Sequence, residues 1–162
     1  MKFLDKDNTL KYGYSTSWGT STRMIGAVVM AHGDERGLAL PPVVAPVQVI
    51  VIPVAQHKEG VIEKARELTE KLVGAGVRAE IDARDASPGW KFNEWEMKGV
   101  PLRIEIGPRD IENGRCVLIR RDNFEKFELP LDDIHIVPEL LKQIQTDMLE
   151  KSRKNRDEHV VS

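Results

Sequence analysis

Apolar side chains recur along the chain in patterns that predict alternating strands and helices. From residue 47 to 52 they are nearly continuous and β-branched, which is typical of a strand buried on both faces. Apolar residues at three- and four-residue spacing over 61–72 then predict a helix, and alternation over 77–82 predicts a strand with one buried face. A strand, a helix and a strand in this order predict a right-handed crossover between two parallel strands.

The second half of the chain adds elements of both kinds. We expect a short helix over 90–98 and strands over 102–106, 116–119 and 124–129, with Asn113-Gly114 as a hairpin signal before an antiparallel fourth strand. An apolar stripe predicts a closing helix from Pro138 that frays after about Glu150. The predicted fold class is α/β, with a mixed, mostly parallel sheet of about five strands flanked by helices.

The first forty residues predict a smaller unit that precedes this sheet. Loose alternation over 11–16 predicts the end of a strand, and a helix is expected from near Thr20 to Gly33. Prolines at 41, 42 and 46 make a stiff connection that a helix cannot cross. We therefore expect three parts, at residues 1–42, 43–137 and 138–162.

Composition narrows the class of protein. The 162 residues carry 24 Lys and Arg against 26 Asp and Glu, so the formal charge of -2 argues against indiscriminate coating of nucleic acid. No apolar run is long enough to span a membrane, and the stretch after Met1 lacks the apolar centre of a signal peptide. The single cysteine excludes an internal disulfide framework and fits a reducing compartment, so a cytoplasmic protein without membrane contact is expected.

Most reactive residues carry no recognisable chemistry. The four histidines are scattered without ligand spacing, so no metal site is predicted. Cys116 lies in an apolar strand, where an inert buried thiol is expected. Neither a P-loop nor a Rossmann glycine pattern is present, and a β-α-β unit alone does not indicate a nucleotide.

Two groups of residues remain as candidates for binding. In the first, hydroxyl side chains from Ser17 to Thr22 precede Arg23 at the start of the predicted helix. A cation at that end opposes the helix dipole, and a bound anion would remove the conflict. The alternative is a capping turn with a solvated arginine.

The second group runs from Arg84 to Asp110. Trp90, Phe92 and Trp95 alternate there with basic and acidic residues, a combination suited to reading a single-stranded RNA loop. A carboxylate repels phosphate but accepts hydrogen bonds from guanine. The alternative is a core helix whose aromatic side chains pack on the sheet and whose charged face is solvated.

Longer stretches of sequence resemble a known family. The first stretch resembles motif 3 and the exit from the catalytic domain of prolyl-tRNA synthetases of the archaeal and eukaryote-like type. It consists of Ser15-Thr16-Ser17-Trp18-Gly19-Thr20-Ser21-Thr22-Arg23-Met24-Ile25-Gly26-Ala27, His32 to Leu38 and Leu40 to Pro42. The segments Ser87 to Pro101 and Glu105 to Asp110 resemble the anticodon-binding domain of that family. The resemblance covers nearly the whole chain.

The resemblance implies specific roles. Arg23 is the expected catalytic residue, which clamps ATP while the carboxylate of proline attacks the α-phosphate, with Mg²⁺ expected in the full-length enzyme. The floor of the ATP and prolyl-adenylate pocket would be lined by Ser17, Trp18, Gly19 and Ser21. Positions that meet the two guanines shared by proline anticodons are Phe92, Glu96, Arg103, Arg109 and Asp110, with Arg109 replaced by Lys in some relatives.

The resemblance also implies that the chain is part of a larger ligase. Motifs 1 and 2 would lie upstream of Met1, and a C-terminal module, zinc-binding in many relatives, would follow Ser162. We thus expect a fragment of a homodimeric proline-tRNA ligase that acts on tRNA(Pro), ATP and proline and is inactive alone, with no zinc in this chain. The helix at 20–33 should then expose Met24, Ile25, Val28 and Val29.

Two alternatives remain open. The chain could be a stand-alone RNA-binding or regulatory module derived from a synthetase, without ligase activity. It could also belong to a related class II enzyme for threonine, glycine or histidine, although the patterns over 91–101 and 105–110 fit proline best.

Overall fold

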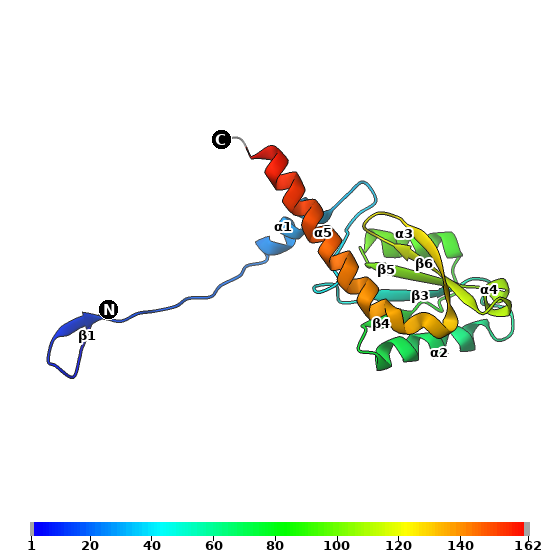
Figure 1. Cartoon of the computed structure of the whole chain (residues 1–162), viewed down its shortest axis with the longest axis horizontal. Helices are drawn as coiled ribbons and strands as arrows, with labels where there is room; N and C mark the ends of the chain where they lie inside the picture. The colour runs from blue at the N-terminus through cyan, green and yellow to red at the C-terminus, as the bar shows by residue number, and fades with distance from the viewer. Residues whose placement is uncertain (1, 161–162) are drawn as a thin grey trace.

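The structure, a computed structural model, describes residues 2–160 and centres on a five-stranded mixed sheet (Figure 1). The strand order is β4-β3-β5-β6-β7, with bounds Val49–Pro53 for β3, Ala79–Ile81 for β4, Leu102–Ile106 for β5, Arg115–Arg120 for β6 and Lys126–Pro130 for β7. β3 is parallel to β4 and β5, whereas β6 is antiparallel to β5 and β7. The predicted mixed sheet is confirmed. Its four pairings divide equally between the two kinds, and every strand except β6 runs in the same direction.

Helices flank the sheet in the expected order. They are α1 at Arg23–His32, α2 at Val61–Gly74, α3 at Pro88–Met97, α4 at Pro108–Glu112 and α5 at Val137–His159, with a 3₁₀ helix, η1, at Leu131–Ile136. The ends of α2 and α3 lie within two residues of the predicted bounds. Ser87 caps α3 through a hydrogen bond from the Trp90 N–H, and Pro88 occupies the first turn, where its missing N–H costs nothing.

Two details differ from the sequence prediction. Asn113-Gly114 does not form a two-residue hairpin: Asn113 ends the short helix α4, which the sequence did not predict, and Gly114 has a φ of 63°. Moreover, α5 continues to His159 instead of fraying after about Glu150. This last part of α5 has no apolar stripe. Ion pairs between residues four positions apart, such as Lys154 and Glu158, stabilise it as a solvated helix.

The two faces of the sheet are covered differently. α2 and α5 bury one face, where side chains of β3, β5 and β6 join Leu68, Leu72, Leu141 and Ile144 in one core. α3 covers part of the other face, where Ile50 and Ile52 pack with its aromatic side chains. The remainder of that second face carries Arg103 and Glu105 on β5, opposite Ile119 and Val117 on β6, and forms the floor of the candidate site.

The chain before residue 33 lies largely outside this body, and only the end of α1, at Ala31 and His32, borders a cavity beside α5. β1 at Lys2–Leu4 and β2 at Leu10–Tyr12 pair as an antiparallel hairpin, and an extended stretch leads from it to α1 (Figure 1). The predicted strand over 11–16 is thus shifted toward the N-terminus. No residue of α1 is buried, and the exposure predicted for Met24, Ile25 and Val29 is confirmed, while Val28 is half-buried.

Residues 34–45 connect α1 to the sheet and pack tightly on the body. Asp34 forms an ion pair with Arg121, which follows the end of β6. Each carboxylate oxygen of Asp34 lies 2.6 Å from a guanidinium nitrogen of Arg121. Ala39 joins the main core, and Arg78 donates hydrogen bonds to the carbonyl oxygens of Pro42 and Ala45. The connection between the two regions is therefore built into the body as far back as Asp34.

Candidate functional site

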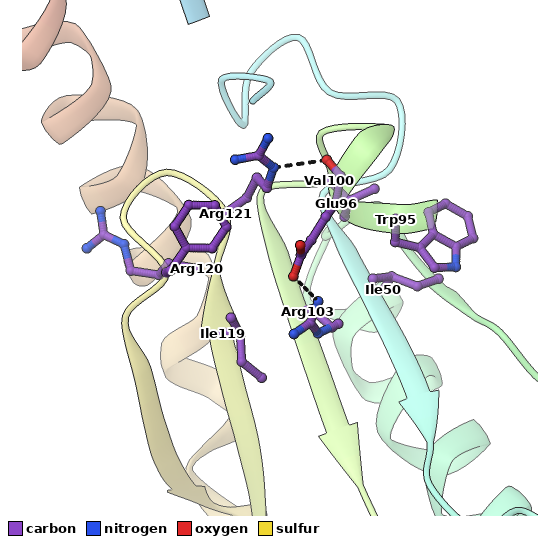
Figure 2. Close-up of a pocket in the computed structure, with 9 residues that line it drawn as sticks. Ile50, Trp95, Glu96, Val100, Arg103, Ile119, Arg120 and Arg121 are labelled. Carbon is purple, nitrogen blue, oxygen red and sulfur yellow. Dashed lines mark hydrogen bonds and ion pairs between the residues drawn. The ribbon is translucent and has the colours of Figure 1, made fainter. Parts of the chain in front are cut away.

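Three of the five predicted anticodon-binding residues lie together beside the open part of the sheet. Phe92 and Glu96 are four residues apart and therefore project from one side of α3, while Arg103 projects from β5. Nη1 of Arg103 donates a hydrogen bond to Oε1 of Glu96 at 2.8 Å (Figure 2). The guanidinium carbon of Arg103 lies 4.4 Å from the ring centroid of Phe92. The arginine is thus held between an aromatic face and a carboxylate.

Glu105 completes this group, although it was not among the predicted site residues. Nε of Arg103 donates a hydrogen bond to Oε1 of Glu105 at 3.0 Å. The two residues are two positions apart in β5, so their side chains leave the same face of the sheet. That spacing was visible in the sequence and was the signal for a second acidic residue. The side chains of Glu96, Arg103 and Glu105 are between 13% and 16% exposed. Their ion pairs hold them in place, and a ligand can still contact them from solvent.

The rim of the site comes from two turns distant in sequence. Arg36 places Nη1 3.6 Å from Oε2 of Glu96, and Nε of Arg121 donates to the carbonyl oxygen of Glu96 at 2.9 Å. Figure 2 shows Arg121 reaching this carbonyl, whereas Arg120 points away toward α5. Phe124 lies under both rim arginines, 4.3 Å from Arg36 and 5.2 Å from Arg121.

These rim residues were not predicted as site residues. Phe124 was expected to begin a strand, but it has a φ of 59° in the turn before β7. Its neighbours Arg36 and Arg121 lie 88 and 3 residues away in sequence, so no local pattern joins the three. Only the tertiary fold brings the turn at 34–37 next to the turn between β6 and β7.

The balance of charge in the site favours selective recognition over attraction of phosphate. Two carboxylates, Glu96 and Glu105, accompany two guanidinium groups, Arg36 and Arg103, so their formal charges cancel. The third guanidinium group, that of Arg121, is neutralised by Asp34. A site for phosphate alone would be strongly positive. Carboxylate acceptors beside an aromatic ring and an arginine provide hydrogen bonds to base edges together with a stacking surface.

Arg109 and Asp110 lie on α4, immediately after the carboxyl end of β5. Arg109 is exposed, whereas Oδ2 of Asp110 accepts a hydrogen bond from the Gly107 N–H at 2.9 Å. Asp110 thereby caps the first turn of its helix with one oxygen. The contacts within the structure therefore join neither residue to the group of Phe92, Glu96 and Arg103, and their role in binding stays a prediction.

A buried polar network holds α3 against the sheet. Asp82 follows β4, is buried, and accepts hydrogen bonds from Arg84 at 2.6 Å and from Nε1 of Trp95 at 2.7 Å. The ion pair with Arg84 lowers the pKa of Asp82 far below its ordinary value. Lys91 is buried beside it and donates to the carbonyl oxygen of Asp82 and to Oε1 of Gln56. These bonds fix the helix that presents Phe92 and Glu96.

The predicted ATP-pocket residues are not gathered into a site. Ser17, Trp18, Gly19 and Ser21 lie in the extended stretch before α1, and Arg23 begins that helix; all five are exposed, Trp18 by 94%. A Cβ placed on Gly19 would meet no atom within 4 Å beyond its chain neighbours. Within residues 2–160 these side chains do not form a cradle that fits ATP.

Other candidate chemistry is accounted for by burial. Cys116 is fully buried in β6, and its burial raises the pKa of the thiol to about 12, with a further contribution from Asp110. The predicted burial of this thiol is confirmed, and a raised pKa disfavours the reactive thiolate. Among residues 2–160, no group of three or more His, Cys, Asp or Glu side chains could hold a metal ion. Nor does any helix in that range have both the length and the apolar character needed to cross a membrane.

Comparison with known proteins tests the resemblance. The family model described as "Anticodon binding domain" matches residues 48–140, more than half of the chain. The chain belongs to the anticodon binding domain family. The match includes the sheet, α2, α3, α4 and the start of α5, and therefore the group of Phe92, Glu96, Arg103 and Glu105.

Curated relatives extend the similarity of this anticodon binding domain beyond the family model. The chain is 52% identical to the proline-tRNA ligase of Clostridium novyi over 160 residues and 56% identical to that of Symbiobacterium thermophilum over 162 residues. In each case the alignment covers 98% of this chain and 33% of the relative. The chain thus spans about a third of the length of the curated relatives it matches, and the resemblance to prolyl-tRNA synthetases is confirmed.

A solved structure agrees. The prolyl-tRNA synthetase of Cryptosporidium parvum, complexed with L-proline and AMP, superposes with a TM-score of 0.90 at 43% identity. The match covers 99% of this chain and 34% of that one. At this identity the likeness supports homology as well as fold, and it includes the segment before residue 48 that the family model leaves out.

Proposed function

We propose that this chain is part of a proline-tRNA ligase and provides the domain that reads the anticodon of tRNA(Pro). The observation that carries the proposal is the group of Phe92, Glu96, Arg103 and Glu105, in which charges are paired and accessible beside an aromatic ring. A guanine brings two N–H donors that a carboxylate accepts and a face that stacks on an aromatic ring. The names of the relatives favour a ligase over a stand-alone RNA-binding module.

Each predicted residue has a role in this proposal. Phe92 stacks on a base, Glu96 accepts hydrogen bonds from a guanine, and Arg103 holds Glu96 in place and donates to the RNA. Arg109 and Asp110, at the end of β5, contact the second guanine or its phosphate. Because Asp110 already caps α4 with Oδ2, its other oxygen is the one that meets RNA.

Titration with RNA tests the proposal. The chain is mixed with a proline-anticodon stem-loop and with a loop whose two shared guanines are replaced, at two salt concentrations. We expect a loss of about 1–3 kcal/mol per guanine with moderate salt dependence. Equal binding of both loops, with a steep decline in salt, would indicate attraction to phosphate alone and contradict base reading.

Residues near the N-terminus would serve the ligase reaction only in a longer protein. In that setting we propose that Ser17, Trp18, Gly19, Ser21 and Arg23 contribute to the site for ATP and prolyl-adenylate, with Mg²⁺ bound alongside ATP. The solved relative complexed with L-proline and AMP supports a site of this kind in the family. Arg23→Ala in the longer ligase should abolish proline-dependent ATP–pyrophosphate exchange, and near-normal exchange would refute the role of Arg23.

The remaining parts of the proposal concern organisation. We propose a cytoplasmic, homodimeric ligase in which this chain is inactive in aminoacylation when alone. We also propose that the boundary with the catalytic domain lies near Gly33 instead of at residue 42, since Asp34 and Ala39 pack on the anticodon-binding body. Likewise, the first half of α5 belongs with that body, because Leu141 and Ile144 lie in its core.

A further inference from the structure

Arg36 is an exposed cation on the rim of the candidate site, outside the residues matched by the family model. Its side chain is 60% exposed and lies over the ring of Phe124, 4.3 Å from the centroid. Its Nη1 approaches Oε2 of Glu96 at 3.6 Å, which is an ion pair but too long for a hydrogen bond. The other oxygen of Glu96 is held by Arg103 at 2.8 Å. Glu96 therefore has one firmly held oxygen and one loosely paired oxygen.

The backbone that carries Arg36 is fixed independently of its side chain. Asp34 forms its bidentate ion pair with Arg121, and the Leu38 N–H donates to the carbonyl oxygen of Met97 at 3.0 Å. Gly37 has a φ of 127°, and a Cβ there would lie 2.7 Å from the backbone of Met97. The turn at 34–37 is therefore pressed against the end of α3. Arg36 can be substituted without removing any of these contacts.

We propose that Arg36, stacked on Phe124, is a further RNA-contacting residue of the anticodon-binding surface. It binds a backbone phosphate beside the guanine whose N–H groups donate hydrogen bonds to Glu96. This inference rests on the proposed function, because it needs an RNA loop in the site. When guanine N–H groups reach Oε2 of Glu96, they take the place of the long ion pair with Arg36. The freed guanidinium, still positioned by Phe124, then faces the sugar-phosphate strand, and its planar fork suits phosphate.

The pairing in the free protein has a second consequence for specificity. Without Arg36, the carboxylates of Glu96 and Glu105 would share the single cation of Arg103, and the remaining negative charge would repel the RNA strand. Without Glu96, Arg36 would attract any phosphate. The ion pair between Arg36 and Glu96 suppresses both effects until a base donates hydrogen bonds to Glu96. Arg36 is thereby available to phosphate mainly when the correct base is bound, although its charge still adds to the affinity for other loops.

Binding of the two stem-loops to four forms of the chain tests this proposal. These are the wild type, Arg36→Ala, Arg36→Lys and Arg66→Ala, which removes an exposed arginine from α2 on the opposite side of the sheet. We expect Arg36→Ala to weaken binding of the guanine-bearing loop about five- to tenfold and to reduce the slope of log K against log salt by about one. Arg36→Lys should keep the wild-type slope, and Arg66→Ala should change neither quantity.

A second set of variants separates contact with RNA from an effect exerted through Glu96. If Arg36 binds phosphate, Arg36→Ala still lowers affinity and slope in a Glu96→Gln background. If Arg36 only orients Glu96, its effect disappears in that background and the proposal is overturned. An unchanged salt slope for Arg36→Ala in the otherwise wild-type chain would also overturn it.

The same data distinguish failure of this inference from failure of the proposed function. A wild-type chain that prefers the guanine-bearing loop, combined with an inert Arg36→Ala, retains anticodon reading and refutes the role of Arg36. A wild-type chain that binds both loops equally contradicts anticodon reading. In that case a slope reduced by Arg36→Ala would still support a phosphate contact at Arg36.

Discussion

The region before residue 33 and the body that follows it place similar apolar side chains in opposite surroundings. Ile25 in α1 is 66% exposed, whereas Ile144 in α5 is fully buried. Both helices present an apolar stripe in sequence, yet only that of α5 meets a sheet. The comparison shows that an amphipathic pattern predicts a helix and the face it would bury, but not whether a partner for that face lies within the chain.

The ionic contacts follow the same division. In the body, each contact of this kind has one buried partner, Asp82 or Arg121, whereas Arg84 and Asp34 are partly exposed. The pair of Arg121 with Asp34 joins segments 87 residues apart. In the N-terminal hairpin the ion pairs of Lys11 with Asp5 and Asp7 are local and exposed. Local exposed pairs add little to stability, so the body should account for nearly all of the cooperative unfolding.

The largest expected effect comes from matched isoleucine substitutions in the two helices. Ile144→Ala removes a fully buried side chain from the core and should lower the free energy of unfolding by about 3–5 kcal/mol. Ile25→Ala in α1 should change it by less than about 0.5 kcal/mol, since most of that side chain already faces solvent. Urea unfolding followed by circular dichroism measures both. Similar losses for the two variants would mean that α1 is packed in solution.

A smaller loss is expected from the polar network beneath α3. Asp82→Ala leaves Lys91 buried without a nearby carboxylate and removes the acceptor for Trp95, so we expect a loss of about 2–3 kcal/mol. Arg84 is half exposed and can be rehydrated, which limits the cost. The exposed neighbour Asp85 provides the control, because Asp85→Ala should leave the urea midpoint unchanged. Equal effects of the two variants would show that the network does not stabilise α3.

The junction between the two regions gives a pH-dependent prediction. Hydrogen bonds from Arg121 lower the pKa of Asp34 from 3.8 to about 2. A carboxyl group whose pKa is lowered on folding stabilises the protein above its unfolded pKa, and this contribution is lost as the pH falls through its folded pKa. Asp34 is partly exposed, so we expect Asp34→Asn to cost only about 1–2 kcal/mol at neutral pH.

The difference between wild type and Asp34→Asn should therefore be constant from neutral pH down to about 4 and shrink as the pH approaches 2. Urea midpoints measured across this range provide the test. A difference that remains unchanged at pH 2 would assign the loss to packing of the turn and not to the charge on Asp34.

Much of the body could be predicted because its signals are local. The β-branched run at 47–52, the alternation at 102–106 and the stripe of α2 each specify one element and its buried face. Phe92, Glu96 and Arg103 were found because a resemblance to relatives pointed to them, and four-residue spacing then placed two of them together.

The parts that were missed depend on contacts between distant segments. Arg36 and Phe124 meet only because the turn at 34–37 folds back against the end of α3. Short elements such as α4 also escaped, since Asn113-Gly114 fits a hairpin and a helix end equally well. The prolines at 41 and 42 suggested a domain boundary. A stiff segment, however, does not reveal whether the residues before it pack on the preceding or on the following domain.

The smallest expected effect is the loss of the extended stretch itself. A chain that begins at Arg23 lacks the hairpin of β1 and β2 but keeps the turn at 34–37 and all of the body. Because Tyr14 and Trp18 are almost fully exposed, the free energy of unfolding should change by less than about 0.5 kcal/mol. Affinity for the anticodon stem-loop should also be unchanged. Brief trypsin treatment should cut after Lys11 well before any site in the core strands, because an exposed two-stranded hairpin opens without unfolding of the body. A marked loss of stability on truncation would show instead that the N-terminal stretch packs on the body, and the two regions would then have to be treated as one cooperative unit.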